Sequence, residues 1–269
     1  MSCLDHWQTL ETIKTLHTNQ IMTDQHWESR YSRQIKLPFV GLEGQKALLD
    51  SRVLVVGVGG LGSPVALYLA AAGVGKLILA DFDQVDESNL QRQIAHHHAD
   101  IGEQKALSAA NKLKAINPEI QVETLDYSLD KSDFLEIVSQ VDLMVDCTDN
   151  FPTRFELNEV SLESNVPLVS GAAIRWEGQV TAFDPRQADS PCYQCLYPNR
   201  DIESATCAME GVISPLVGVI GTMQALEAVN ILLGKGQLHG VVWLFDAQYM
   251  EWQQMKLPKN PNCPACGTA

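Results

Sequence analysis

VLVVGVGGLG, residues 53–62, is the stretch that decides the fold of this chain. Its first four residues are aliphatic and mostly β-branched, a pattern that predicts a buried strand. Gly57, Gly59, Gly60 and Gly62 then form a GxGGxG turn that leads into a helix. Glycine allows such a tight turn and lets the backbone approach a phosphate group, and a helix N-terminus attracts anions. The stretch therefore predicts the first strand–turn–helix unit of a nucleotide-binding sheet.

Further apolar runs alternate with stretches of helical pattern along the first part of the chain. This alternation predicts an α/β fold, with a Rossmann-like, mostly parallel sheet and helices on both faces. After Gly171 the runs 179–183 and 241–245 have no crossover helix, so they predict added antiparallel strands. The predicted parallel strands are 53–56, 77–80, 120–125, 143–147 and 167–170, and the predicted helices are 61–72, 104–116, 131–139 and 152–164.

Composition narrows the class of protein. The formal net charge is −14, from 33 acidic and 19 basic residues, which argues against binding to nucleic acid or to an anionic membrane. The N-terminus has no apolar core of the signal-peptide type, so the predicted location is the cytoplasm. Residues 212–233 are apolar enough to span a bilayer, but Gln224, Glu227 and Asn230 favour a buried helix of a soluble core.

Two acidic residues follow predicted strands and mark the nucleotide site. Asp81 lies 19 residues beyond Gly62, where a carboxylate accepts hydrogen bonds from ribose hydroxyls, and this position serves NAD or ATP equally well. Asp149, in DCTDN (146–150), is predicted to lie beside the phosphates, because parallel strands end at one edge of a sheet. A carboxylate there would repel a polyphosphate, so a bridging Mg²⁺ is predicted.

Basic residues accompany these acids. Asn89 and Arg92 in SNLQRQ (88–93) lie three apart, and Lys105 opens a predicted helix. Arg92 and Lys105 are candidates to neutralise charge that builds on a triphosphate during displacement. The adjacent His96, His97 and His98 have no matching ligand pattern, so we expect them to be surface residues.

Four of the seven cysteines form two CxxC pairs, Cys192 with Cys195 and Cys263 with Cys266. Four thiolates predict a tetrahedral structural zinc site without an open position for water; a redox dithiol or an iron–sulfur cluster are the alternatives. Cys207 lies in the polar stretch SATCAMEG, either as an exposed nucleophile or as an incidental loop cysteine.

Taken together, these segments resemble the ubiquitin-activating-enzyme superfamily, specifically its bacterial MoeB/ThiF branch. The resemblance covers nearly all of residues 29–267, and residues 1–28 form an extension beyond it. SGAAIRWEGQ (170–179) is closer to the molybdopterin-synthase adenylyltransferases, which we prefer, whereas CLYPN (195–199) is more similar to the thiamine-pathway relatives. The other matching segments are RYSRQI (30–35), GVGGLG (57–62), DFDQVDESNLQRQ (81–93), DCTDN (146–150), CYQCL (192–196), TCAMEGVISPLVGVIGTMQALEA (206–228) and NCPACG (262–267).

The resemblance implies a reaction and its partners. The C-terminal Gly-Gly carboxylate of a small ubiquitin-like sulfur carrier would attack the α-phosphate of ATP, giving an acyl-adenylate and pyrophosphate, and sulfur would later replace AMP. The carrier would be the small subunit of molybdopterin synthase, or alternatively the sulfur carrier of thiamine synthesis. Because the chain ends just after Cys266, without the rhodanese-like domain of some relatives, a separate sulfur donor is expected.

The resemblance also assigns residues. It implies catalytic roles for Asp149, Arg92 and Lys105, and it makes Arg33 reach the ATP of a neighbouring subunit in a homodimer. Cys207 matches a loop cysteine with a role in sulfur chemistry in the thiamine branch only. Residues 29–269 would form one adenylation domain, with a nucleotide-binding half (50–170) and a carrier-binding, zinc-holding half (171–269). The nucleotide-contacting set would be Gly57, Gly59, Gly60, Gly62, Asp81, Ser88, Asn89, Leu90, Gln91, Arg92, Lys105, Asp149 and Asn150.

Two other classes of protein compete with this interpretation. An NAD-dependent dehydrogenase would account for the glycine turn and Asp81, but it leaves SNLQR, Lys105 and Asp149 unexplained. A non-catalytic, zinc-clipped scaffold that only binds a carrier protein would not need the full set of phosphate-facing residues.

Overall fold

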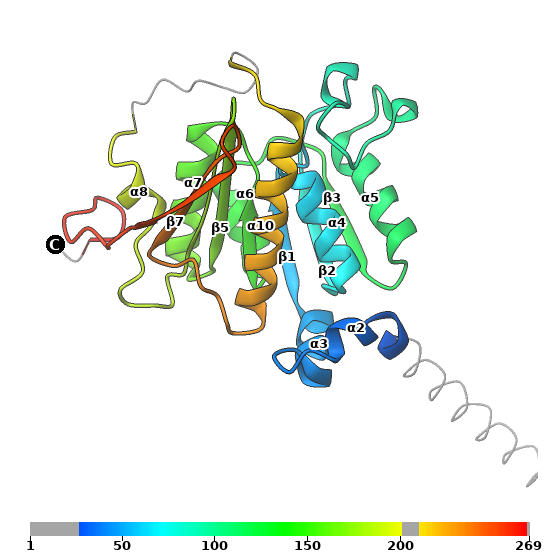
Figure 1. Ribbon diagram of the computed structural model, residues 1–269, viewed down its shortest axis with the longest axis horizontal. Coiled ribbons are helices and arrows are strands. Elements are labelled where there is room, and N and C mark those ends of the chain that lie inside the picture. Colours follow the sequence, from blue (N-terminus) through cyan, green and yellow to red (C-terminus); the bar gives the residue numbers. More distant parts are fainter. Residues whose placement is uncertain (1–26, 201–209, 268–269) are drawn as a thin grey trace, which may run out of the picture. The chain divides into compact units, whose positions relative to one another are not determined.

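The computed structural model of the protein describes residues 27–200 and 210–267 (Figure 1). Most of the extension at 1–28, and Cys207, lie outside the described residues. The chain divides into two compact units, residues 1–46 and residues 47–269.

The described part of the first unit is a short helical segment. It holds α2 (Ser32–Ile35) and the start of α3 (Gly41–Asp50). Within this unit, the Gln34 side-chain amide donates to Gln45 Oε1 at 2.7 Å. Arg33 is exposed on α2.

The second unit is built on a single eight-stranded sheet with the strand order β3-β2-β1-β4-β5-β6-β7-β8. The first five strands in this order run parallel, and the last three pair antiparallel. The α/β fold predicted from the alternating pattern is therefore confirmed, including its antiparallel extension. The strands are β1 (Arg52–Val56), β2 (Lys76–Ala80), β3 (Gln121–Leu125), β4 (Leu143–Asp146), β5 (Leu168–Ile174), β6 (Glu177–Phe183), β7 (Val241–Asp246) and β8 (Glu251–Lys256).

Helices cover both faces of this sheet. The side chains of β1, β2 and β4 are therefore buried on both faces, as is usual for parallel strands. On one face, Val53, Val55 and Leu77 pack in a cluster with α4, α5 and α10, and on the other face Leu54 and Ile78 pack with α6 and α7. The helices are α4 (Gly62–Ala72), α5 (Lys105–Ile116), α6 (Lys131–Val138), α7 (Phe151–Ser164), α8 (Tyr193–Leu196) and α10 (Ser214–Leu232).

Helix α10 is the one helix in the described part of the chain that is long and apolar enough to cross a membrane. It packs along α4, β5 and β6, with half of its most apolar window buried inside the protein (Figure 1). Its buried polar residues have internal partners: Gln224 Nε2 donates to the carbonyl of Asp146 at 2.7 Å, and Glu227 Oε1 accepts from the N–H of Leu238 at 2.8 Å. These contacts fit a core helix, as the sequence predicts.

Strand β8 was not predicted from the sequence. Its residues, EWQQMK, are exposed at the edge of the sheet, so they lack the alternating apolar pattern of a half-buried strand. It forms because β7 offers a free edge, and Trp252 stacks on Phe245 of that strand with ring centroids 4.4 Å apart.

Candidate functional site

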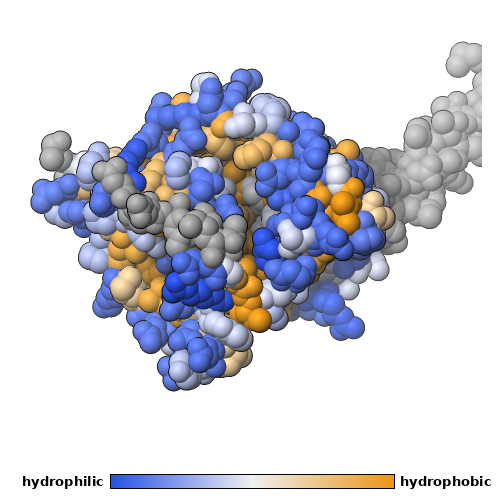
Figure 2. Space-filling model, turned by 90° about the horizontal axis from the view of Figure 1, so that it is seen from above, coloured by the Kyte–Doolittle hydropathy of each residue, from blue (hydrophilic) through white to orange (hydrophobic). Residues whose placement is uncertain are grey.

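A cavity of 610 Å³ opens where the carboxyl ends of the parallel strands meet. Its volume is typical of a small-molecule site, and its place is the one where open α/β sheets bind ligands. Figure 2 views the molecule from above, where mostly hydrophilic residues surround the apolar patches of this face. Several residues that the sequence predicted for the nucleotide site line the cavity together: Gly57, Gly59, Gly60, Asp81, Arg92, Lys105, Asp149 and Asn150.

The glycine turn takes a shape that other residues would not allow. Gly57 has a φ of +84°, in the left-handed region, and a Cβ on Gly62 would lie 1.9 Å from the carbonyl oxygen of Gly57. The turn thus folds tightly back on itself between β1 and α4. The N-terminus of α4 consequently begins beside the cavity, with backbone N–H groups available for an anion.

Asp81 follows β2, and its carboxylate accepts a hydrogen bond from the backbone of the glycine turn. Its Oδ2 accepts the N–H of Val58 at 2.7 Å, and its Oδ1 accepts the N–H of Asp83 at 3.0 Å. Burial raises the pKa of the Asp81 carboxyl, although the Val58 bond and the nearby Lys105 act in the opposite direction. The carboxylate is thus fixed in place at the cavity wall, where a ribose hydroxyl could reach it.

Lys105, at the start of α5, is 6% exposed and so is not a solvated surface charge. Its Nζ pairs with Asp83 Oδ2 at 2.8 Å. Arg92 is half-buried, and its guanidinium donates to the carbonyl of Ser88 at 3.2 Å. Both cations lie in the cavity wall with Asp81, so the site can balance the charge of a polyphosphate.

Asp149 is exposed at the cavity, three residues after the end of β4. The next residue, Asn150, is the N-cap of α7, and its Oδ1 accepts the N–H of Thr153 at 3.0 Å. Asp149 thus sits between a strand end and a capped helix, which restricts its backbone while leaving its carboxylate open to a ligand.

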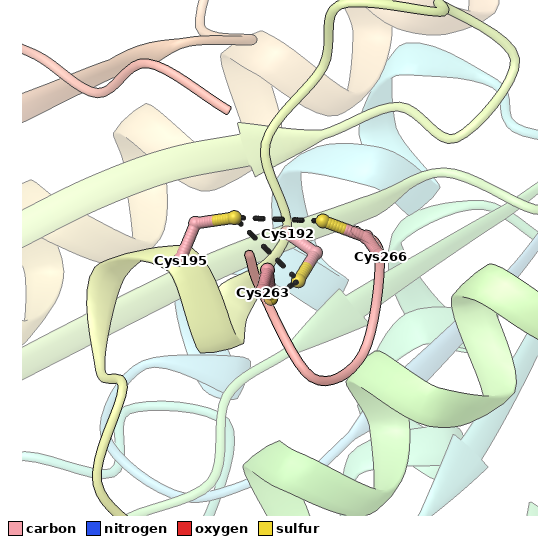
Figure 3. A group of neighbouring side chains, drawn as sticks. All are labelled: Cys192, Cys195, Cys263 and Cys266. Atoms are coloured by element: carbon pink, nitrogen blue, oxygen red, sulfur yellow. Dashed lines mark hydrogen bonds between the residues drawn. The ribbon is translucent and has the colours of Figure 1, made fainter. Parts of the chain in front are cut away.

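The two CxxC pairs come together, one pair from α8 and its N-cap and the other from the segment after β8 (Figure 3). The four sulfur atoms all lie within 4.8 Å of one another, with Cys192 Sγ 3.6 Å from Cys263 Sγ and Cys195 Sγ 3.5 Å from Cys266 Sγ. The N–H of Asn260 points at Cys195 Sγ at 3.5 Å, a contact that stabilises a thiolate. These four thiols could hold a metal ion, and doing so would join α8 to the segment after β8.

Comparison with known proteins identifies the family. Residues 31–265 match the ThiF family over most of the chain. The chain belongs to the ThiF family. The resemblance drawn from its motifs is therefore confirmed.

Relatives of this ThiF-family chain include enzymes that act on different carriers. It is 46% identical to the molybdopterin-synthase adenylyltransferase of Escherichia coli, over 88% of this chain and 96% of the relative. It is 43% identical to the sulfur carrier protein ThiS adenylyltransferase of the same species, over 88% of this chain and 94% of the relative. Among solved structures, E. coli MccB with ATP shares the fold at a TM-score of 0.75 and 22% identity, covering 88% of this chain and 74% of that one.

Not every residue predicted for the site lies at the cavity. Arg33 belongs to the first compact unit, and Cys207 lies outside the described residues. Asp86 caps the turn that holds several of the others, because its Oδ1 accepts the N–H of Ser88 at 2.8 Å. The predicted residues that do not line the cavity in the described part of the ThiF-family domain are Gly62, Ser88, Asn89, Leu90 and Gln91.

The sequence does not predict the buried ion pair between Arg154 and Asp146, which contacts the residue before Asp149. Arg154 on α7 lines the cavity, and its guanidinium donates to the carbonyls of Thr148 and Gly171, the latter at 3.3 Å. Its Nε lies 3.9 Å from Oδ2 of the fully buried Asp146. Asp146 in turn accepts from the Thr148 hydroxyl at 2.7 Å, so the pair supports the residue that precedes Asp149.

We expect Arg154→Met to destabilise the protein by about 3–5 kcal/mol, because it leaves the Asp146 carboxylate buried without a counter-charge. Urea denaturation gives the free energy of unfolding. The double variant Arg154→Met/Asp146→Asn removes both charges and should recover part of the loss. Equal stabilities for the single variant and the native protein would show that the pair does not support this loop.

The expectation that all three adjacent histidines lie on the surface is wrong for His96. His97 and His98 are exposed, but His96 is 5% exposed and points inward. Its Nε2 lies 3.0 Å from the carbonyl oxygen of Val58, and its Nδ1 lies 2.8 Å from the hydroxyl of Ser108 on α5. Adjacent side chains point in different directions, so one member of the run could be buried while its neighbours were solvated.

Proposed function

We propose that this protein adenylylates the C-terminal Gly-Gly carboxylate of a small ubiquitin-like sulfur carrier, using ATP and releasing pyrophosphate. The observation that carries the proposal is the cavity in which a glycine turn, Asp81, two cations and Asp149 face the same space. The names of the relatives, which are adenylyltransferases of sulfur-carrier proteins, support this reaction for a ThiF-family chain.

Each side chain has a role in this reaction. The glycine turn and the N-terminus of α4 bind the phosphates, and Asp81 accepts hydrogen bonds from the ribose hydroxyls. The carrier carboxylate attacks the α-phosphate, and the bond to pyrophosphate breaks. Arg92 and Lys105 stabilise the negative charge that develops on the phosphate oxygens. Asp149 would hold a Mg²⁺ ion, which would supply positive charge to offset that of the phosphates.

Hydride transfer would use fewer of the residues that line this cavity than adenylylation would. A dehydrogenase site of this fold needs the glycine turn and Asp81 but has no comparable use for two cations and an exposed carboxylate beside the phosphates. A scaffold that only binds a carrier protein, without catalysis, needs neither the glycine turn and Asp81 nor the two cations and the exposed carboxylate. Transfer of AMP from ATP to a carrier uses all of these groups.

The preferred carrier is the small subunit of molybdopterin synthase, with the sulfur carrier of thiamine synthesis as the alternative. Both kinds of adenylyltransferase occur among the relatives at similar identity, so the motif SGAAIRWEGQ (170–179) decides the preference. The acyl-adenylate would then receive sulfur from a separate donor in the cytoplasm, for molybdenum cofactor synthesis.

The four-cysteine cluster is proposed to hold a structural zinc ion. Four sulfur ligands within reach of one ion match the tetrahedral thiolate sites that zinc prefers. All ligands would come from the protein, so no position is left for water or substrate. In the cytoplasm, where thiols stay reduced, this arrangement favours metal over a disulfide.

Mass spectrometry of the carrier tests the proposal directly. Incubation of the protein with ATP, Mg²⁺ and the molybdopterin-synthase small subunit should add one AMP to the C-terminal glycine of the carrier. A carrier that lacks its last glycine serves as the control and should stay unmodified. Absence of the adduct with both candidate carriers, together with oxidation of NADH by a small substrate, would favour the dehydrogenase instead.

We further propose that the protein is a homodimer in which Arg33 of one subunit acts at the ATP site of the other. Arg33 is exposed on α2, as a residue that reaches a neighbouring subunit must be. Arg33→Ala and Asp149→Ala should each be inactive alone. A mixture of the two should regain part of the activity, because mixed dimers contain one intact site. A mixture without activity, although subunits exchange, would contradict the arrangement.

A further inference from the structure

Val58 is the residue of the glycine turn whose backbone is held on both sides. Its N–H donates to Asp81 Oδ2 at 2.7 Å, and its carbonyl accepts from the ring of His96 at 3.0 Å. The hydroxyl of Ser63 lies farther from the same carbonyl, at 3.4 Å. His96 is therefore the closer donor to this carbonyl.

The hydrogen-bond partners of His96 determine which ring nitrogen carries a proton. The carbonyl of Val58 can only accept, so Nε2 must donate in every protonation state of the ring. Burial lowers the pKa of His96, while the charged groups around it, Lys105, Asp81 and Asp100, act in both directions. Nδ1 lies 2.8 Å from the hydroxyl oxygen of Ser108, which donates its one hydrogen to Asp100 Oδ2 at 2.8 Å, so it is the Val58 carbonyl that requires the proton on Nε2.

Holding the Val58 carbonyl also orients the next N–H group. The carbonyl of Val58 and the N–H of Gly59 belong to one planar trans peptide unit, in which the two groups point in opposite directions. Gly59 lines the cavity, and within the described ranges 27–200 and 210–267 its N–H has no hydrogen-bond acceptor. A bond that draws the carbonyl toward His96 therefore turns this N–H away from His96.

We propose that His96 is a positioning residue for the nucleotide: it holds the Val58 carbonyl so that the Gly59 N–H is fixed toward a phosphate oxygen of a nucleoside triphosphate. His96 does not touch the nucleotide itself. It acts through the peptide between Val58 and Gly59, and the Ser108 hydroxyl on α5 contacts its other ring nitrogen at 2.8 Å. This inference rests on the nucleotide site proposed above.

Two substitutions separate this role from a structural one. The amide nitrogen of glutamine can take the place of Nε2, whereas that of asparagine reaches only as far as Nδ1. His96→Gln can thus keep the donor to Val58, and His96→Asn keeps only the contact with Ser108. The matched control is His98→Asn, because His98 carries the same side chain in an exposed position of the same segment.

The measurement is the dissociation constant of ATP with Mg²⁺, by calorimetry without carrier, beside the melting temperature of each variant. We expect His96→Asn to raise the Kd for ATP about tenfold, as for the loss of one hydrogen bond. His96→Gln should stay within about threefold of the native protein, and His98→Asn should not change Kd. In the exchange reaction, KM for ATP should rise in His96→Asn while kcat changes little.

Equal values of Kd for His96→Asn and His96→Gln would overturn the inference, whatever the melting temperatures. If His96→Asn does not fold, His96→Met replaces it, since methionine fills the same buried position but cannot donate to the Val58 carbonyl; a Kd unchanged from the native protein would then overturn the inference. The Kd is read without carrier, so tight ATP binding by a protein that adenylylates no carrier would count against the proposed function alone.

Discussion

Replacement of Asp149 by asparagine is expected to lower the rate of carrier adenylation about a thousandfold or more, because the ligand that we propose for Mg²⁺ is lost from a step that builds negative charge. Asp149 lies open at the cavity, close to the glycine turn and both cations. An asparagine side chain keeps the size but not the charge. The measurement is the rate of pyrophosphate release under saturating ATP and carrier.

The stability of this variant should not change. Asp149 is exposed, and substitutions at exposed positions without structural contacts usually alter the free energy of unfolding by less than about 0.5 kcal/mol. Asp189→Asn is the matched control, since Asp189 is exposed and lies away from the cavity. Activity of the Asp149 variant within a few-fold of the control would remove Asp149 from the catalytic site.

The second large effect is expected on removal of the metal ion that we propose for the four-cysteine cluster. The ligands come from segments 71 residues apart, so the ion would join α8 to the segment after β8. A zinc-selective chelator, or Cys263→Ser, should lower Tm by roughly 10 °C, since a structural metal contributes its binding energy to folding. Differential scanning calorimetry of the protein without nucleotide measures this change.

The variant also provides the control for the chelator. Cys263→Ser should bind no zinc, so the chelator should not lower its Tm further. Metal analysis should find one zinc ion per native chain and none in the variant. A native protein that contains no metal, and whose Tm does not respond to the chelator, would contradict the proposal that the four cysteines hold a structural metal ion.

The parts of the fold that the sequence predicts are those built by local pattern. The run Val53–Val56 is a strand because β-branched residues fill a sheet buried on both faces, and the turn after it needs glycine at Gly57 for a positive φ. Strand β8 lies beyond this kind of reasoning. Its polar residues carry no period, and only the free edge of β7 makes them a strand.

The candidate site divides in the same way. Asp81 and Asp149 follow strands, so the geometry of a parallel sheet brings them to one edge, as the sequence predicts. Arg154 and His96 gave no such signal, because a polar residue in a helix or a loop is exposed by default. Tertiary contacts bury them: the Asp146 carboxylate offsets the charge of Arg154, and the Val58 carbonyl and Ser108 hydroxyl satisfy His96.

The most direct test of the central claim is ATP–pyrophosphate exchange with Mg²⁺ and each of the two Gly-Gly carriers. Reversible formation of an acyl-adenylate predicts that labelled pyrophosphate enters ATP when a carrier is present, and more rapidly with the molybdopterin-synthase small subunit. Exchange that fails with both carriers, in a protein that is folded and loaded with zinc, would contradict carrier adenylation.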